Sequence, residues 1–237
     1  MGTPDTVVVI GGGSGMGLAV ARRCLADGAR VVIAGRSAER LARARAELDR
    51  VETATVDLGD QAGVARLFDH VGALRHLVVT AGDLPYGPVS TLTEDALMRG
   101  VRSKILGPFF AAQHAAPRMG AGGSITFTSG IAAYRPIPGG SVAAAVNGAI
   151  DSMVRAFALE LAPVRVNAVS PGWVDTPIWD TLATPQAKRM RFAEMGSRLP
   201  GGRIATPDDI ANAIVYVMND AFVTSTVLHA EGGQLLV

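Results

Sequence analysis

A glycine-rich stretch near the N-terminus has the residue types and spacing of a phosphate-binding turn. The stretch GGGSGMGLAVARRCLADG follows an apolar run and supplies Gly11, Gly15 and Gly17 directly before an alanine-rich segment. Small residues let the backbone turn tightly and approach a pyrophosphate, whose charge the free N–H groups of a helix N-terminus stabilise. A strand before the glycines and a helix after them form the context that this chemistry requires. The stretch therefore predicts dinucleotide binding.

The residue after the second apolar run selects between the two common dinucleotides. An acidic residue there would bind the adenosine ribose 2′-hydroxyl and repel a 2′-phosphate, but this chain has Gly35 followed by Arg36. A guanidinium forms charge-assisted hydrogen bonds with a 2′-phosphate. We therefore expect NADP(H) to be favoured, with NAD(H) possible. The alternative is an exposed arginine at a helix start, since Ser37 has the properties of an N-cap.

Seven short runs rich in β-branched residues alternate with longer helical patterns. These elements would position the glycine-rich stretch and Arg36. The runs lie at 6–10, 30–34, 53–56, 76–80, 124–128, 164–169 and 226–230. Most are continuously apolar, as in a parallel sheet that helices cover on both faces. The sequence therefore predicts an α/β, doubly wound Rossmann fold with a seven-stranded parallel sheet, in one dinucleotide-binding domain over residues 1–237.

Three longer segments stand out from this alternation. Segments 93–119 and 141–162 are rich in Ala and Gly with few charges, so they are expected to be helices that are deeply buried or pack against another subunit. Residues 175–206 hold several prolines and are expected to form an irregular loop that acts as a substrate lid. In the same region, Trp173 and Trp179 would line an apolar pocket or anchor the loop, and Asp175 would contact substrate or stabilise the loop.

Six motifs distributed over nearly the whole chain belong together. They are IGGGSGMG (10–17), VDL (56–58), VTAG (79–82), GGSITFTSG (122–130), VRVNAVSPGWVDT (164–176) and HAEGG (229–233). In combination they resemble the single-domain type of short-chain dehydrogenase/reductase. The resemblance implies an oxidoreductase that acts on a small molecule with a nicotinamide cofactor, and a homotetramer or homodimer formed through the two Ala-rich helices.

The resemblance also implies which residues bind the cofactor. Asp57 and Leu58 would meet the adenine ring, and Ala81 and Gly82 would flank the ribose on the nicotinamide side. A segment after the sixth strand would hold the nicotinamide and its amide. The implied set is Gly11, Ser14, Gly15, Met16, Gly17, Arg36, Asp57, Leu58, Ala81, Gly82, Lys104, Pro171, Gly172, Val174 and Thr176.

The catalytic pattern of that family is matched only in part. The family joins an asparagine, a serine, a proton-donating tyrosine and a lysine that holds the ribose, and Ser129 matches the serine. Ala143 stands at the tyrosine position and Asn147 at the lysine position, four residues apart on one helix face. The segment VRSKILGPFF, which matches the one that usually carries the asparagine, has Lys104. Lysine and asparagine are thus exchanged.

The exchange suggests a rebuilt site. Our hypothesis is that Lys104 reaches the nicotinamide ribose from the opposite wall while Asn147 offers neutral hydrogen bonds; alternatively, Lys104 extends to solvent from a long helix. No residue replaces the tyrosine by position, and the candidate proton donors are Lys104, Tyr134, Tyr86 and Ser141. Tyr134 is preferred among the tyrosines, with a packing role as its alternative. An iminium or enone substrate would need less help from a donor.

Composition excludes several other classes of protein. With 22 basic and 21 acidic residues and no basic stripe, nucleic acid is not an expected partner. We find no basic region before a long apolar run at the N-terminus and no apolar stretch of membrane-spanning length, so no membrane association and a cytoplasmic location are expected. The single cysteine, Cys24, and four scattered histidines give no metal-binding pattern.

The sequence as a whole predicts an NADP(H)-dependent oxidoreductase acting on a small carbonyl, imine or enone compound. The alternative is a protein that keeps the cofactor-binding fold but has a non-redox or regulatory role. Retention of Ser129 and Thr176 favours redox chemistry, whereas Ala143 favours the alternative. Substrate identity, reaction direction, stereochemistry and the source of the proton are not encoded in any pattern that we can read.

Overall fold

The computed structural model describes residues 5–237, apart from the side chains of residues 181 and 182. At its centre is a parallel sheet of seven strands in the order β3-β2-β1-β4-β5-β6-β7. The strands are β1 (Thr6–Ile10), β2 (Arg30–Gly35), β3 (Glu52–Thr55), β4 (His76–Val79), β5 (Ser124–Thr128), β6 (Arg165–Pro171) and β7 (Val227–Ala230). The predicted α/β, doubly wound fold with a seven-stranded parallel sheet is confirmed.

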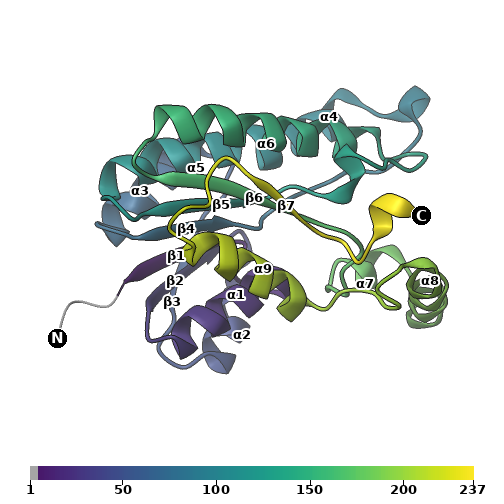
Figure 1. Ribbon diagram of the computed structural model, residues 1–237, viewed down its shortest axis with the longest axis horizontal. Helices are drawn as coiled ribbons and strands as arrows, with labels where there is room; N and C mark the ends of the chain where they lie inside the picture. Colours follow the sequence, from purple (N-terminus) through teal and green to yellow (C-terminus); the bar gives the residue numbers. More distant parts are fainter. Residues whose placement is uncertain (1–4) are drawn as a thin grey trace.

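Helices cover both faces of the sheet (Figure 1). The face with α3, α5 and α6 lies opposite the face with α1, α2 and α9, and α7 and α8 lie together at one end. The α-helices are α1 (Gly15–Ala26), α2 (Ala38–Glu47), α3 (Gln61–Val71), α4 (Glu94–Val101), α5 (Gly107–Ala115), α6 (Ser141–Glu160), α7 (Trp179–Leu182), α8 (Pro185–Arg198) and α9 (Pro207–Asn219). Short 3₁₀ turns are η1 (Val89–Thr91), η3 (Ala116–Arg118), η4 (Ile131–Ala133) and η5 (Gln234–Leu236), and η2 (Arg102–Leu106) is a π-helical turn.

The core has two layers because successive residues of a strand point to opposite faces. In β1, Val8 and Ile10 belong to the cluster under α3, α5 and α6, whereas Val7 and Val9 belong to the cluster under α1 and α9. All four are essentially buried. This two-sided burial explains why the strands read as continuous apolar runs, and it leaves the carboxyl ends of the strands as the edge where polar residues gather.

Segment 175–206 departs from its predicted irregular structure. It contains the 14-residue helix α8. Thr184 caps this helix by accepting from the backbone N–H of Ala187, and Pro185 stands at the first helical position, where its missing N–H costs nothing. Pro185 is one of the prolines that indicated a loop, but it begins a helix. The prediction was therefore wrong for residues 185–198.

Helix α6 corrects a second expectation, that the chain has no apolar stretch of membrane-spanning length. By length and composition α6 could cross a membrane. Its buried side chains, among them Val146 and Ile150, pack on β6 and η4 instead, as in the core helix of a sheet protein. The helix also carries the buried polar residues Asn147 and Asp151.

A buried histidine lies at the opposite end of the sheet from the glycine-rich turn. His76, at the start of β4, contacts the hydroxyl of Ser124 through Nδ1 at 2.8 Å, and that hydroxyl donates to the carbonyl of Met218. The Ser124 proton is therefore used, so His76 carries its own proton on Nδ1. Burial, reinforced by the positive charge of Arg75, lowers the pKa of His76 from 6.5 to about 4.

His76 is expected to make the protein less stable in mild acid. Because its pKa is lower in the folded state, the unfolded chain binds the proton first, and the stabilisation present above about pH 6.5 is lost as the pH falls towards about 4. The loss is on the order of 3 kcal/mol at most. Urea unfolding across this pH range measures it. In His76→Gln the slope should flatten, and an unchanged slope would contradict the assignment.

Candidate active site at the carboxyl ends of the strands

The glycine-rich turn that joins β1 to α1 leaves no room for a side chain at Gly17. A Cβ added at Gly17 would lie 2.3 Å from the carbonyl oxygen of Gly11 and 2.5 Å from Oγ1 of Thr80. Gly11 has a φ of +96°, which also favours glycine. Ser14 precedes α1 without a side-chain capping bond, so the N-terminus of this helix keeps its N–H groups free for an anion. The turn fits the pyrophosphate of a dinucleotide.

Two arginines border the side of the turn where an adenosine would lie. Arg36 follows β2 and is exposed, and Ser37 caps α2 as the alternative interpretation of Arg36 supposed. Sequence reasoning missed Arg40, whose Cβ would lie 3.3 Å from a Cβ at Gly13. Its position four residues after Arg36, on the first turn of α2, was the available signal. Both guanidiniums are candidates for a 2′-phosphate.

Asp57 and Leu58, the two implied adenine contacts, have different surroundings. Oδ1 of Asp57 accepts from the backbone N–H of Gly59 at 2.9 Å, which holds the loop after β3. Leu58 is buried in the core against Gly107 of α5, where an added Cβ would lie 2.4 Å from the leucine Cγ. Its side chain is therefore committed to packing, and only its backbone is available to an adenine ring.

Lys104 is the charged residue at the centre of the site. It projects from the π-helical turn η2, and only 5% of it is exposed. Its Nζ donates to the carbonyl oxygen of Thr128 at 2.6 Å and to the Thr128 hydroxyl at 3.3 Å, at the end of β5. The proposed alternative, a side chain extending to solvent, is wrong. Single π-turns inside helices are frequent at functional sites because the extra residue re-aims a side chain.

A glycine makes the path of this lysine possible. A Cβ at Gly82, after β4, would lie 2.8 Å from Cε of Lys104, so the aliphatic stem passes directly over the backbone there. Burial lowers the pKa of Lys104 to about 8, and the negative charge of Asp151 opposes that shift. An ammonium with such a pKa releases its proton more readily than an exposed lysine does.

Ser129 and Asn147 lie beside Lys104 across the end of β5. The Ser129 hydroxyl donates to the backbone carbonyl of Asn147 at 3.3 Å, and both residues are buried. The Asn147 amide presses on Gly130, where a Cβ would lie 2.7 Å from Nδ2, and its Oδ1 has no hydrogen-bond partner. A buried, unpaired carbonyl oxygen is an acceptor available to a ligand. Ala143, one turn earlier, is fully buried and offers no polar group.

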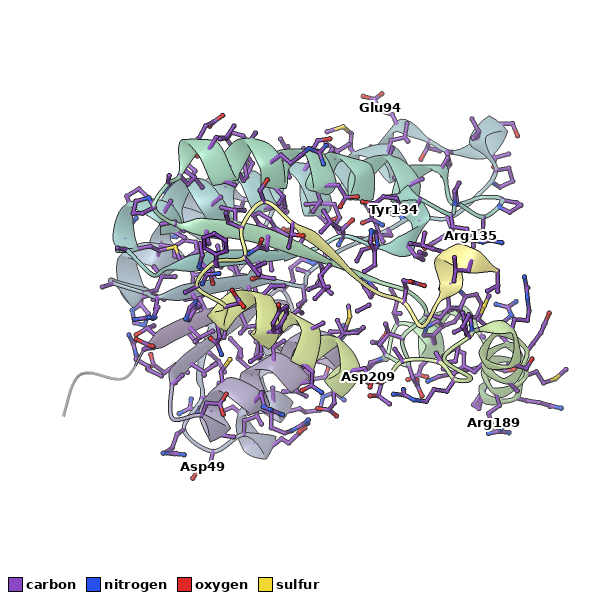
Figure 2. All side chains as sticks on the ribbon, in the orientation of Figure 1. Asp49, Glu94, Tyr134, Arg135, Arg189 and Asp209 are labelled. Atoms are coloured by element: carbon purple, nitrogen blue, oxygen red, sulfur yellow. The ribbon has the colours of Figure 1, made fainter. Side chains whose placement is uncertain are left out.

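Tyr134 lies on the side of the sheet that α6 covers (Figure 2). Burial and then the Asp151 carboxylate raise its pKa to about 12, and its ring meets His229 edge to face at 4.6 Å. A higher pKa makes it a weaker acid than an ordinary tyrosine. Sequence reasoning also missed Asp151, a buried carboxylate whose spacing of four from Asn147 was the signal.

The other two candidate donors lie near the rim. Tyr86, half exposed, is on the loop after β4, where the N–H of Gly87 donates to the carbonyl of Gly139 at 2.9 Å. Burial raises the pKa of Tyr86. Ser141 is exposed at the start of α6. Both residues thus lie on the loop after β4 and the first turn of α6, whereas the Lys104 amine contacts the end of β5.

The two lysines of the chain allow a direct test of the Lys104 environment. With lysine labelled by ¹³C at Cε, NMR titration is expected to give one signal with a pKa near 8 for Lys104. Lys188 serves as the internal control, because hydrogen bonds with Asp175 and Asp180 raise its pKa above 10.5. Two signals that both titrate above 10 would contradict the buried placement of Lys104.

The segment after β6 connects the candidate site to residues 175–206, the segment predicted to be a lid. Pro171 ends β6, Gly172 packs against Gln234, and Val174 pairs with Ala205 in an isolated bridge. Thr176 reaches the glycine-rich turn, since its Cγ2 would lie 3.3 Å from a Cβ at Gly15. Thr176 therefore stands where the lid meets the phosphate-binding turn.

The predicted lid segment is held by an aromatic cluster and by ion pairs. Trp173 and Trp179 pack with ring centroids 4.7 Å apart, and Phe192 of α8 meets Trp179 at 5.2 Å. Lys188 bridges Asp175 at 2.8 Å and Asp180 at 3.0 Å. Both tryptophans thus anchor this segment by packing, and Asp175 forms an ion pair.

Neither a metal site nor a reactive thiol is found among the described residues. Over residues 5–237, no group of three or more His, Cys, Asp or Glu residues could hold a metal ion. The one cysteine, Cys24, is buried on α1, and burial raises the pKa of its thiol to about 12, so it is a poor nucleophile. The described polar groups converge instead on the ends of β4, β5 and β6.

Comparison with known proteins agrees with this geometry. The family model described as enoyl-(acyl carrier protein) reductase matches residues 11–234. The short-chain dehydrogenase/reductase ATR9 of Stachybotrys chlorohalonatus is 34% identical over 98% of this chain and 97% of its own length. The chain belongs to the short-chain dehydrogenase/reductase family.

Solved structures of other short-chain dehydrogenases/reductases are similar throughout. The MalC reductase/Diels-Alderase of Malbranchea aurantiaca has a TM-score of 0.92 at 31% identity and covers 99% of this chain and 98% of that one. A small-chain dehydrogenase in complex with NADPH has a TM-score of 0.84 at 31% identity, covering 99% and 100% of the two chains. This short-chain dehydrogenase/reductase is therefore an oxidoreductase by family, and the similarity covers 99% of the chain.

Proposed function

We propose that the chain is an NADP(H)-dependent oxidoreductase that transfers hydride to or from a small carbonyl, imine or enone compound through a rebuilt catalytic site. The carrying observation is the buried Lys104, whose Nζ donates to Thr128 at 2.6 Å next to Ser129. A bound nicotinamide dinucleotide would supply or accept the hydride. The relative in complex with NADPH and the two arginines at the adenosine side support NADP(H) over NAD(H).

The proposal gives each residue a role. Lys104 holds the positive charge of the site and is the proton donor, because its pKa of about 8 lies near the working pH. Ser129 orients the reacting oxygen or nitrogen. Asn147 accepts a ligand hydrogen bond with its unpaired Oδ1. Tyr134 stays a candidate donor, but its raised pKa makes it second to Lys104.

The remaining residues would hold the cofactor. Gly11, Ser14, Gly15, Met16 and Gly17 would bind the pyrophosphate side, and Arg36, Asp57 and the Leu58 backbone the adenosine side. Ala81, Gly82, Pro171, Gly172, Val174 and Thr176 would border the nicotinamide, with residues 175–206 as the substrate lid. The basis is the close-packed turn at Gly17 and the approach of Thr176 to Gly15.

A second candidate function is non-redox chemistry or regulation on a cofactor-binding fold. Ala143 favours it, since no hydroxyl stands at that position. The relative named a reductase/Diels-Alderase carries a redox and a non-redox activity in its name, so the two candidates are compatible on one fold. The redox function ranks first because the polar residues around Lys104 remain.

The expected assembly follows the family resemblance, and the expected location follows the sequence patterns given above. We expect a cytoplasmic homodimer or homotetramer formed through α5 and α6, where Phe109 and Leu159 are exposed. Light scattering coupled to size exclusion tests the assembly.

The experiment that separates the two candidates uses reduced nicotinamide absorbance. The protein is incubated with NADPH and a panel of ketones, cyclic imines and enones. Substrate-dependent loss of NADPH is expected, fastest for imines and enones because hydride addition there needs less proton donation. Tight NADPH binding without turnover over the whole panel would favour the non-redox candidate.

A matched pair of variants assigns the proton donor. Tyr134→Phe is expected to lower kcat less than Lys104→Met does, because the pKa of Tyr134 is raised to about 12 and its hydroxyl is therefore the weaker acid. Rates are measured with saturating NADPH and the best substrate of the panel. A larger loss in Tyr134→Phe than in Lys104→Met would move the donor to Tyr134.

A further inference from the structure

One ion pair crosses the adenosine side of the dinucleotide site. Nη1 of Arg36 lies 3.4 Å from Oδ2 of Asp83. Arg36 follows β2 and Asp83 follows β4, and β1 lies between these strands in the sheet. The end of β1 opens directly into the glycine-rich turn. The pair therefore spans the turn from one neighbouring strand to the other, where a nucleotide bound at this edge has to pass.

The two partners are held unequally. The backbone N–H of Asp83 donates to Oγ of Ser103 at 3.0 Å, and the same hydroxyl lies 3.2 Å from the Asp83 carbonyl oxygen, which it can donate to. Ser103 belongs to η2, the turn that also positions Lys104. The side chain of Asp83 is 31% exposed, whereas that of Arg36 is 61% exposed. The backbone of Asp83 is thus held in place, and the more exposed guanidinium is the partner with more room to change rotamer.

We propose that Asp83 is a specificity-determining residue that competes with the 2′-phosphate of NADP(H) for Arg36. Binding of a 2′-phosphorylated dinucleotide exchanges the Arg36–Asp83 pair for an Arg36–phosphate pair. A dinucleotide with a free 2′-hydroxyl binds with the Arg36–Asp83 pair intact. Asp83 therefore lowers the preference for NADP(H) that Arg36 alone would give. The inference rests on the dinucleotide site of the proposed function, but not on its redox chemistry.

The expected effect is moderate because the pair is partly exposed. Exposed ion pairs with a single contact contribute little, whereas phosphate binds a guanidinium through two parallel hydrogen bonds. The exchange is therefore favourable overall, and removing the competing ion pair alone is worth up to roughly a fivefold gain in affinity. A carboxylate beside a phosphate also repels it, which acts in the same direction.

The test measures binding rather than turnover. Calorimetry with 2′,5′-ADP and 5′-ADP isolates the adenosine half, and fluorescence titration with NADPH and NADH covers the whole cofactor. Asp83→Asn keeps the size and the backbone bonds to Ser103 but removes the charge. It is expected to lower the Kd of 2′,5′-ADP and NADPH about threefold to tenfold and to change the Kd of 5′-ADP and NADH less than about twofold. Asp69→Asn is the matched control. It lies on α3 and removes the carboxylate partner of Arg118.

A second variant tests the exchange itself. In the Arg36→Ala background, Asp83→Asn should lose most of its effect on 2′,5′-ADP, because no guanidinium is left to compete for. An equal gain in that background would assign the effect to direct repulsion and overturn the exchange. Equal changes for the phosphorylated and unphosphorylated ligands, or weaker NADH binding, would show that Asp83 contacts the ribose itself and would also overturn it. If the unsubstituted protein binds none of the four ligands, the dinucleotide site fails together with this inference; if it binds them and Asp83→Asn changes nothing, only the inference fails.

Discussion

Lys104→Met is expected to lower kcat by about 100-fold, which corresponds to about 2.7 kcal/mol of transition-state stabilisation. Methionine has a similar length and keeps the path over Gly82, but it removes both the charge and the proton. The acceptor at Thr128 loses its 2.6 Å hydrogen bond, while the cost of burying an ammonium disappears, so the fold should persist. Steady-state rates with NADPH and thermal unfolding measure the two consequences separately.

The pH profile distinguishes proton donation from a purely structural role of Lys104. A donor has to be protonated, so the rate of reduction should fall about tenfold per pH unit above its pKa of about 8. Lys104→Met should have no such limb. Lys188→Met, which removes the other lysine of the chain, should keep it. An unchanged kcat in Lys104→Met would remove the basis of the proposed mechanism.

Gly17→Ala is expected to abolish dinucleotide binding, with a Kd raised at least about 100-fold for NADPH and NADH alike. The added Cβ would lie 2.3 Å from the carbonyl oxygen of Gly11, which is backbone and cannot rotate away. Either the turn or α1 has to shift, and overpacking of this kind costs about 1–3 kcal/mol of stability. Fluorescence titration gives the affinity, and a lower Tm by roughly 3–10 °C should accompany it.

Gly120→Ala is the matched control for this glycine. A Cβ at Gly120 would meet nothing within 4 Å, and the residue lies before β5, away from the glycine-rich turn. Its Tm and NADPH affinity should match those of the unsubstituted protein. Wild-type affinity in Gly17→Ala would show that the dinucleotide does not lie on this turn.

The sheet and the dinucleotide turn were predictable because their signals are local. Val7–Ile10 read as a strand buried on both faces, and Gly11, Gly15 and Gly17 have a spacing that follows from one backbone conformation. Helix α8 was not predicted, since Pro185 signals a helix start as well as a loop and the decision depends on how Thr184 caps it. The membrane-length stretch in α6 was missed for a related reason: its apolar composition becomes meaningful only once its packing is known.

The candidate catalytic residues show the same limit more sharply. The sequence placed Lys104 and Asn147 at exchanged positions. It did not decide whether the Lys104 side chain extends to solvent or into the interior. The structure decides for the interior, through a π-turn that aims the side chain and a glycine at position 82 that leaves it space. It also adds Asp151, whose buried charge acts on Lys104 and Tyr134 from a third element. The spacing within one helix could not reveal these partners.

By itself the sequence determined the order of strands and helices, the phosphate-binding turn and the family, because each depends on neighbours within one strand–turn–helix unit or on the set of motifs. Only the tertiary structure decided which polar groups meet. Lys104 contacts Thr128 at the end of β5, and Arg36 pairs with Asp83 across β1. The physical reason is that the pKa of a side chain and the strength of an ion pair depend on burial and on distances between residues far apart in the chain. Those distances are fixed only when the seven strands assemble and bring their carboxyl ends to one edge.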